Sequence, residues 1–214
     1  MTEAEWLACA DPEAMLKSLP NLDRAADRKL RFFAVASCRC IASFVQNEHL
    51  RGVVNTVERY ADGQATHREM VSAAKTSDWV GLLSERRDRV LAHAAWYASA
   101  MNVWNSWRRR ARTIRIVRYL LAYDRAQAPY QAALLREFFG NPFRPVTVDP
   151  GWRRSDVVAL ARDIYAERAF DRLPILADAL QDAGCDSDDL LTHLRGPGPH
   201  VRGCWALDLV LGKE

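Results

Sequence analysis

The chain has 214 residues, of which 49% are hydrophobic and 27% are charged, with a formal net charge of +3. This composition is that of a globular protein with a real core, and it excludes disordered and fibrous classes. So small a net charge neither requires nor excludes nucleic acid as a partner, because the placement of the charges decides that. No uncharged stretch is apolar enough to predict a membrane span, and the acidic beginning lacks the pattern of a secretory signal. We therefore expect a cytoplasmic protein without membrane contact, whose five cysteines are reduced thiols.

Two short helices are expected to open the chain. Thr2 with Glu5 fits a capping box, in which each residue satisfies a backbone N–H of the other. Asp11 before Pro12 fits an N-cap followed by a first-turn proline.

Longer helices follow from Asp23 to about Gln127. The first has apolar residues every three or four positions, the spacing of a helix with one buried face. These residues are Leu30, Phe33, Ala34, Cys38, Ile41, Phe44 and Val45. Thr66 with Glu69 forms another capping box, and Ser77-Asp78 is expected to cap a new helix. A break is expected near residues 102–106, because Asn and Ser side chains compete for backbone hydrogen bonds.

The last third of the chain is divided by proline and glycine. A helix from Pro129 to Phe139 is expected to end at a left-handed Gly140. The following residues permit a short strand around Val146 and Val148. Short helices are then expected from residue 155 or 156, over 171–183 with Gly184 closing the latter, over 186–194, and over 204–211 with Trp205, Leu209 and Val210 buried.

These elements predict an all-α fold: a multi-helix bundle over residues 1–140, and a C-terminal cluster of short helices joined by Pro/Gly-rich turns over residues 141–214. The second part either forms a module of its own or packs on the same core.

Three segments near the C-terminus carry a resemblance to a known family. They read FGNPFRPVTVDPGW, YAERAFDRLPILADALQDAGC and LRGPGPHVRGCWALDLVLGK. They resemble an uncharacterised protein family of planctomycete bacteria, and the opening WLACADPEAML with DRKLRFFAVASCRC is similar to the usual start of its members. The resemblance implies a reusable C-terminal module attached to varied N-terminal regions, and it supplies no catalytic role. Relatives often carry more cysteines where this chain has residues 36–40.

One hypothesis for a metal site joins Cys38 and Cys40 to His200 and Cys204. Thiols and imidazoles are the ligands that zinc prefers. However, zinc sites usually draw thiolate pairs from a C-x2-C knuckle, and two cysteines two positions apart on a helix point about 200° apart. We therefore favour Cys38 as a core residue, Cys204 as packing beside Trp205, and no metal or other cofactor.

A basic stripe carries the arginines Arg108, Arg109, Arg110, Arg112, Arg115 and Arg118. On a helix whose apolar residues face the core, most of these arginines share the remaining face. Such a face can bind the phosphates of nucleic acid or another polyanion, with Arg108, Arg109, Arg112 and Arg115 as the candidates. The alternative is a solvated face that pairs with the acidic C-terminal region.

The loop RGPGPHVRG offers a candidate ligand surface through Arg195, His200 and Arg202. Glycines allow close approach, and a helix N-terminus attracts anions. The loop lacks the GK[ST] ending of a phosphate-binding P-loop, and we favour a structural clasp, in which His200 is hydrogen-bonded in place, over a ligand site. The aspartates Asp171, Asp178, Asp182, Asp186, Asp188 and Asp189 are more typical of caps than of catalytic pairs.

No catalytic residue is predicted, since no nucleophile and base stand at a recognised spacing. The sequence has many well-defined Gly/Pro turns but no catalytic motif. This combination favours a protein–protein interaction or scaffold module whose partner is another protein. The alternative is polyanion binding through the Arg108–Arg118 helix face.

Overall fold

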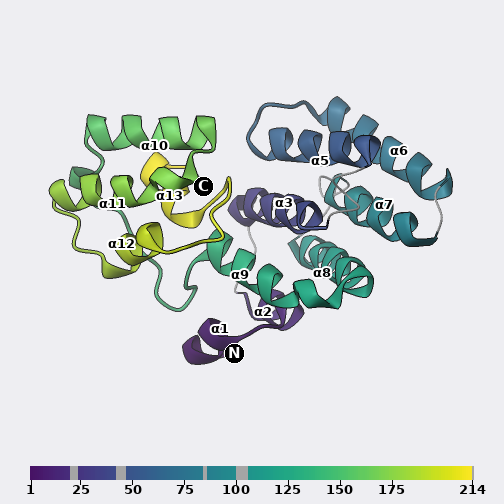
Figure 1. Ribbon diagram of the computed structural model, residues 1–214, viewed down its shortest axis with the longest axis horizontal. Coiled ribbons are helices and arrows are strands. Elements are labelled where there is room, and N and C mark those ends of the chain that lie inside the picture. The colour runs from purple at the N-terminus through teal and green to yellow at the C-terminus, as the bar shows by residue number, and fades with distance from the viewer. Residues whose placement is uncertain (20–23, 42–46, 84–85, 100–105, 214) are drawn as a thin grey trace. The chain divides into compact units, whose positions relative to one another are not determined.

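A computed structural model describes residues 1–19, 24–41, 47–83, 86–99 and 106–213 (Figure 1). Over these residues the regular structure is helical and contains no strand. The predicted all-α fold is therefore confirmed. The chain divides into two compact units, residues 1–136 and residues 137–214; the sequence predicted a boundary after residue 140.

The first unit is a bundle of helices. Its helices are α1 (Glu3–Ala8), α2 (Pro12–Ser18), α3 (Arg24–Arg39), α5 (Glu48–Ala61), α6 (His67–Leu83), α7 (Arg86–Ser99) and α8 (Ser106–Tyr123), and it includes most of α9 (Ala128–Phe139). Helix α3 packs on α5, α7 and α8, while α6 packs on α5 and α7. As predicted, the apolar face of α3 is buried, including Leu30, Phe33 and Cys38. Phe44, Val45 and most of the predicted break at residues 102–106 lie outside the described residues.

Side chains cap several helix starts in this unit. The Thr2–Glu5 box is present, with the Thr2 N–H donating to Glu5 Oε2 over 2.7 Å, and Asp11 caps α2 as predicted. The cap predicted at Ser77-Asp78 is wrong. Ser77 is buried inside α6 and its hydroxyl donates to the Ala73 carbonyl oxygen four residues earlier over 3.2 Å, which lets the helix continue.

The second unit contains four short helices, α10 (Ser155–Glu167), α11 (Leu173–Asp182), α12 (Asp188–Arg195) and α13 (Trp205–Leu211), together with the end of α9. Helix α10 packs on α11 and α13, and α12 packs on α11 and α13 (Figure 1). Their apolar faces form one core that includes Val157, Ile164, Leu173, Leu176, Leu180, Leu190, Leu194, Leu207 and Val210. This is the predicted cluster of short helices joined by Pro/Gly-rich turns.

Several details of this unit differ from the sequence-based predictions. No strand forms at Val146 and Val148. The residue before α10 is Arg154, which makes no side-chain cap, so neither Ser155 nor Asp156 caps that helix. The helix expected from residue 171 begins at Leu173, after a 3-10 turn at Phe170–Arg172. The helix expected from residue 186 begins at Asp188, because the Ser187 hydroxyl accepts the Leu190 N–H over 3.4 Å.

Two sites of helix termination are as predicted. Gly140 after α9 and Gly184 after α11 both have positive φ, +61° and +91°. Of the three residues expected to be buried in α13, Val210 is buried, whereas Trp205 and Leu209 are half-buried. Trp205 instead lies against the backbone of Gly140, where a Cβ atom would stand 3.2 Å from the indole ring. No helix among the described residues is long and apolar enough to cross a membrane.

Candidate metal centre

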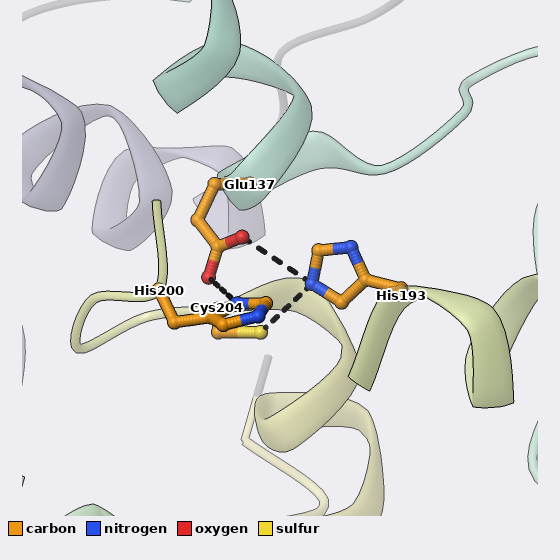
Figure 2. A group of neighbouring side chains, drawn as sticks. All are labelled: Glu137, His193, His200 and Cys204. Atoms are coloured by element: carbon orange, nitrogen blue, oxygen red, sulfur yellow. Dashed lines mark hydrogen bonds and ion pairs between the residues drawn. The ribbon is translucent and has the colours of Figure 1, made fainter. Parts of the chain in front are cut away.

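Four side chains of the second unit converge on one point (Figure 2). They are Glu137 at the end of α9, His193 in the last turn of α12, His200 in the following loop and Cys204 immediately before α13. One ligand-type atom from each lies within 4.8 Å of the others. We call this group the Glu-His-His-Cys cluster, and the Gly-Pro loop is residues 196–203 between its second and fourth members.

Glu137 lies at the centre of the cluster. Its carboxylate faces both imidazoles, with Oε2 3.3 Å from His193 Nε2 and Oε1 3.3 Å from His200 Nδ1 (Figure 2). The residue is only 2% exposed, and burial acts to raise the pKa of its carboxyl group. The hydrogen bonds and charges of the two histidines outweigh burial, so the net direction of the Glu137 pKa is downward. The site therefore favours a carboxylate anion, and a buried anion requires a cation or donors beside it.

His200 is oriented by the Gly-Pro loop. Its Nε2 lies 3.0 Å from the Gly196 carbonyl oxygen, and a carbonyl only accepts, so Nε2 carries the hydrogen. The opposite nitrogen, Nδ1, then points at Glu137. The loop makes this geometry only with glycine at position 198, where φ is +91° and a Cβ atom would stand 2.5 Å from the His200 backbone nitrogen.

The proton on His200 Nδ1 is the one a metal would replace. Burial acts to lower the His200 pKa, but the hydrogen bond and charge of Glu137 outweigh it and the net direction is upward. A metal-free site can thus hold an imidazolium paired with Glu137. A metal ion competes with that proton for the same lone pair, and the Gly196 carbonyl oxygen is the outer partner that a ligating histidine ordinarily has.

His193 and Cys204 complete the group. His193 Nε2 lies 3.2 Å from Cys204 Sγ, and the His193 ring packs against the Trp205 indole with centroids 5.0 Å apart. Cys204 is fully buried, and burial together with the negative charge of Glu137 raises the pKa of its thiol well above the ordinary value. The thiol is therefore protonated in the metal-free site, and only a bound cation would make it a thiolate at neutral pH.

One carboxylate oxygen, two imidazole nitrogens and one thiol sulfur are all ligands of zinc. In a tetrahedral zinc site the ligand atoms are about 3.3–3.7 Å apart, given bonds of about 2.0–2.3 Å. Three contacts of 3.2–3.3 Å within the cluster, in which Glu137 Oε2 faces His193 and Oε1 faces His200, are already close to that spacing. The soft sulfur and the imidazoles disfavour Mg²⁺ and Ca²⁺, which prefer oxygen ligands.

The structure places the predicted loop residues Arg195, His200 and Arg202 in three different settings. His200 is in the cluster. Arg195 donates to Asp178 Oδ1 over 2.7 Å on the neighbouring helix α11. Arg202 donates to the Tyr165 carbonyl oxygen at the end of α10 over 3.2 Å and lies over the Tyr165 ring. Arg195 and Arg202 therefore both contact helices of the same unit.

The basic stripe of α8 also makes contacts within its own unit. Arg118 donates to both carboxylate oxygens of Glu13 in α2, with Nε 2.8 Å from Oε2. Arg112 is half-buried and Arg115 is exposed, and both have interactions of their own. The side chains of Arg108 and Arg109 lie outside the described part of the structure.

The sequence-based zinc hypothesis named two of the four residues of this cluster. His200 and Cys204 do come together, but the described groups of metal-ligand type near them are Glu137 and His193. Cys38 is fully buried in α3, and its pKa is raised chiefly by this burial. As favoured from the sequence, Cys38 is a core residue.

Two signals could have pointed to the residues that the sequence analysis missed. Glu137 is a carboxylate in the last turn of a helix, where the helix dipole disfavours negative charge, and it lies between the buried residues Leu135 and Phe138. His193 stands seven residues before His200, so the segment already contains an H-x6-H-x3-C pattern. Neither signal connects the end of α9 with the segment from His193 to Cys204. Glu137 and His193 are 56 positions apart in the chain.

Comparisons with known proteins return no match: no family model, no curated protein and no solved structure resembles this chain significantly.

Proposed function

We propose that the C-terminal unit is a zinc-binding module in which Glu137, His193, His200 and Cys204 are the four ligands. The observation that carries this proposal is the convergence of four ligand atoms of types that zinc binds, all within 4.8 Å of one another. A bound metal ion would give the buried Glu137 carboxylate the neighbouring cation that a buried anion requires, in place of the His200 proton.

A structural role for the ion fits this ligand set better than a catalytic one. Structural zinc sites use four protein ligands, whereas catalytic sites keep one position for water or substrate. Four protein side chains are available here, and two of them, Glu137 and Cys204, are buried. A structural ion supports the function that the sequence favours, a scaffold that presents a fixed surface to another protein.

The metal content of the full-length chain tests the proposal. Protein purified without chelators should contain one equivalent of zinc by elemental analysis. Replacing zinc with Co²⁺ should give the visible absorption of a tetrahedral site, together with a sulfur-to-cobalt charge-transfer band in the near ultraviolet.

Two substitutions separate the site from general effects on folding. Cys204→Ala should remove the charge-transfer band and weaken binding, whereas Cys185→Ala should change neither. Cys185 is a matched control because it is also a buried thiol of the second unit and lies outside the cluster. A folded wild-type chain that takes up no zinc or cobalt would refute the proposal.

Polyanion binding through Arg108, Arg109, Arg112 and Arg115 is the second candidate function, which the exposure of Arg115 on α8 allows. Its test is the affinity for DNA and RNA as a function of salt. Binding through phosphates requires a steep decrease of log K with log salt, and a loss of affinity when these arginines are replaced by alanine. An affinity for DNA and RNA that does not change with salt would refute this candidate function.

A further inference from the structure

We propose that the bound ion acts as a latch for the Gly-Pro loop, so that residues 196–203 are ordered only when zinc is bound. This inference rests on the proposed zinc site, and it adds which part of the molecule the ion controls. The physical question is what holds the loop when the ion is absent.

The Gly-Pro loop lacks an apolar anchor of its own. From residue 196 to residue 202 none of the residues is buried, and Pro197 and Gly198 are exposed. The loop therefore gains little from the hydrophobic effect, which is the main source of stability for a folded segment. Its glycines also lose more conformational entropy on ordering than other residues do.

Some of the contacts that hold the loop lead to the cluster. The Val201 N–H donates to Glu137 Oε1 over 3.4 Å, and His200 contacts both Glu137 and the Gly196 carbonyl oxygen. Outside the cluster, Arg202 donates to the Tyr165 and Ala166 carbonyl oxygens at the end of α10 and lies over the Tyr165 ring. Two of the four ligands, His200 and Cys204, are in the loop or directly after it, so the loop cannot move away while the ion remains bound to both.

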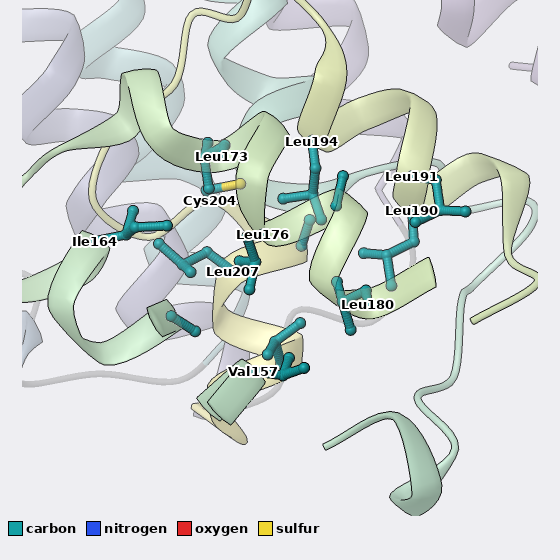
Figure 3. Packing of buried hydrophobic residues seen from close by; sticks show 14 of the residues in the cluster. Val157, Ile164, Leu173, Leu176, Leu180, Leu190, Leu191, Leu194, Cys204 and Leu207 are labelled. Atoms are coloured by element: carbon teal, nitrogen blue, oxygen red, sulfur yellow. The ribbon is translucent and has the colours of Figure 1, made fainter. Parts of the chain in front are cut away.

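The helices around the loop, unlike the loop itself, are held by buried apolar side chains. Helices α10, α11, α12 and α13 share a continuous apolar core, and Figure 3 shows members of it from all four helices, among them Ile164, Leu176, Leu194 and Leu207. Leu176, Leu194 and Leu207 are fully buried. This core does not depend on the ion, so loss of zinc should loosen the loop and leave the four helices folded.

Because zinc binding and loop opening are linked, the opening of the loop can be measured as a function of the free zinc concentration. If the loop opens only after the ion leaves, the open population falls by the factor 1 + [Zn]/Kd. Hydrogen exchange of loop amides then slows about tenfold for each tenfold rise in free zinc above Kd, whereas amides that open without releasing the ion are insensitive to zinc. The reporters are the N–H groups of Gly196, Val201 and Cys204, each of which donates a hydrogen bond in this structure.

The experiment is hydrogen exchange by mass spectrometry on the full-length chain over a series of buffered free zinc concentrations. Peptides over residues 196–203 should show the tenfold dependence. Peptides within α10 and α11 should change by less than about twofold. Glu137→Gln should raise the loop's exchange rate at a zinc concentration that protects the wild type, and Cys185→Ala should behave as the wild type does.

Each outcome decides the matter. Loop exchange that does not respond to zinc, in samples that contain bound zinc, overturns the latch and leaves the proposed zinc site intact. Zinc-dependent exchange that is equal in the loop, α10 and α11 also overturns it, because the ion would then hold the whole unit. Absence of bound zinc in the same samples refutes the zinc site, and the latch with it.

Discussion

Gly140→Ala should weaken both the second unit and its metal site. Gly140 has a φ of +61°, and a Cβ atom there would lie 3.2 Å from Trp205 Cδ2. Trp205 packs on His193, a cluster residue, with ring centroids 5.0 Å apart. The substitution therefore strains the backbone and also pushes on the indole that positions a ligand.

Gly184→Ala is the matched control. Gly184 also follows a helix in the second unit, and its φ is +91°, but a Cβ atom there meets no atom within 4 Å. The left-handed conformation costs a residue with a Cβ atom about 1–2 kcal/mol, partly offset by about 0.4–1 kcal/mol from the stiffer unfolded chain. Gly184→Ala should therefore destabilise the unit by about 1 kcal/mol.

Gly140→Ala carries the same backbone cost and a packing cost besides. Forcing an extra methyl into a packed position typically costs about 1–3 kcal/mol, so the total should be about 2–4 kcal/mol. Movement of a group that orients a ligand typically lowers metal affinity by about 10- to 100-fold. Gly184→Ala should leave the metal affinity unchanged.

Two measurements check this pair of variants. Native-state hydrogen exchange of α12 and α13 amides gives the free energy of opening of the second unit, and competition with a chelator gives the zinc affinity. Equal destabilisation by the two variants would refute the role of the Trp205 contact. A loss of stability in Gly140→Ala with unchanged zinc affinity would refute the argument that Trp205 positions His193.

Three further predictions concern the core, the clasp and the response to acid. Leu176→Ala should lower the free energy of unfolding of the second unit by about 2–5 kcal/mol in urea titrations, because this fully buried side chain leaves a cavity. Arg202→Ala should lower the free energy of unfolding of the second unit by about 1–2 kcal/mol, because it removes a hydrogen bond to the end of α10. Arg195→Ala should lower it by less than about 1 kcal/mol, because the Arg195–Asp178 ion pair is largely exposed. Hydrogen bonds from Arg118 and then Lys17 lower the pKa of Glu13 to about 2, so the ion pair stabilises the first unit above the ordinary glutamate pKa and this contribution is lost as the pH falls towards 2. Glu13→Gln should therefore lower the free energy of unfolding at pH 7 by about 1 kcal/mol or less, as for other surface ion pairs. If the variant remained less stable than the wild type by the same amount at pH 2, this explanation would be wrong.

Local sequence signals predicted the helix ends well where the signal is itself local. The Thr2–Glu5 box and the left-handed Gly140 depend on atoms within one turn of the chain, so they form wherever a helix starts or stops there. Ser77 was misread as a cap because the same hydroxyl can also bond to a carbonyl four residues earlier, and the burial of Ser77 against the rest of the bundle favours the continued helix.

The candidate site was only half visible in the sequence. His200 and Cys204 are close in the chain, and the rigid loop between them indicated that their positions matter. The zinc hypothesis joined these two residues to Cys38 and Cys40 on the basis of residue type. The spacing of those cysteines then favoured a protein without a metal site. Residue type and spacing cannot say which distant segment packs beside a loop.

The sequence by itself determined an all-α chain, its capping boxes, its glycine stops and the division of its last third into short helices, because periodicity and turn chemistry act over a few residues. Only the tertiary structure decided that Glu137 meets His193, His200 and Cys204. That meeting depends on how the core of α10, α11, α12 and α13 places the Gly-Pro loop against the end of α9. Packing between segments 56 positions apart in the chain, rather than any local pattern, turns four ordinary side chains into a candidate metal centre.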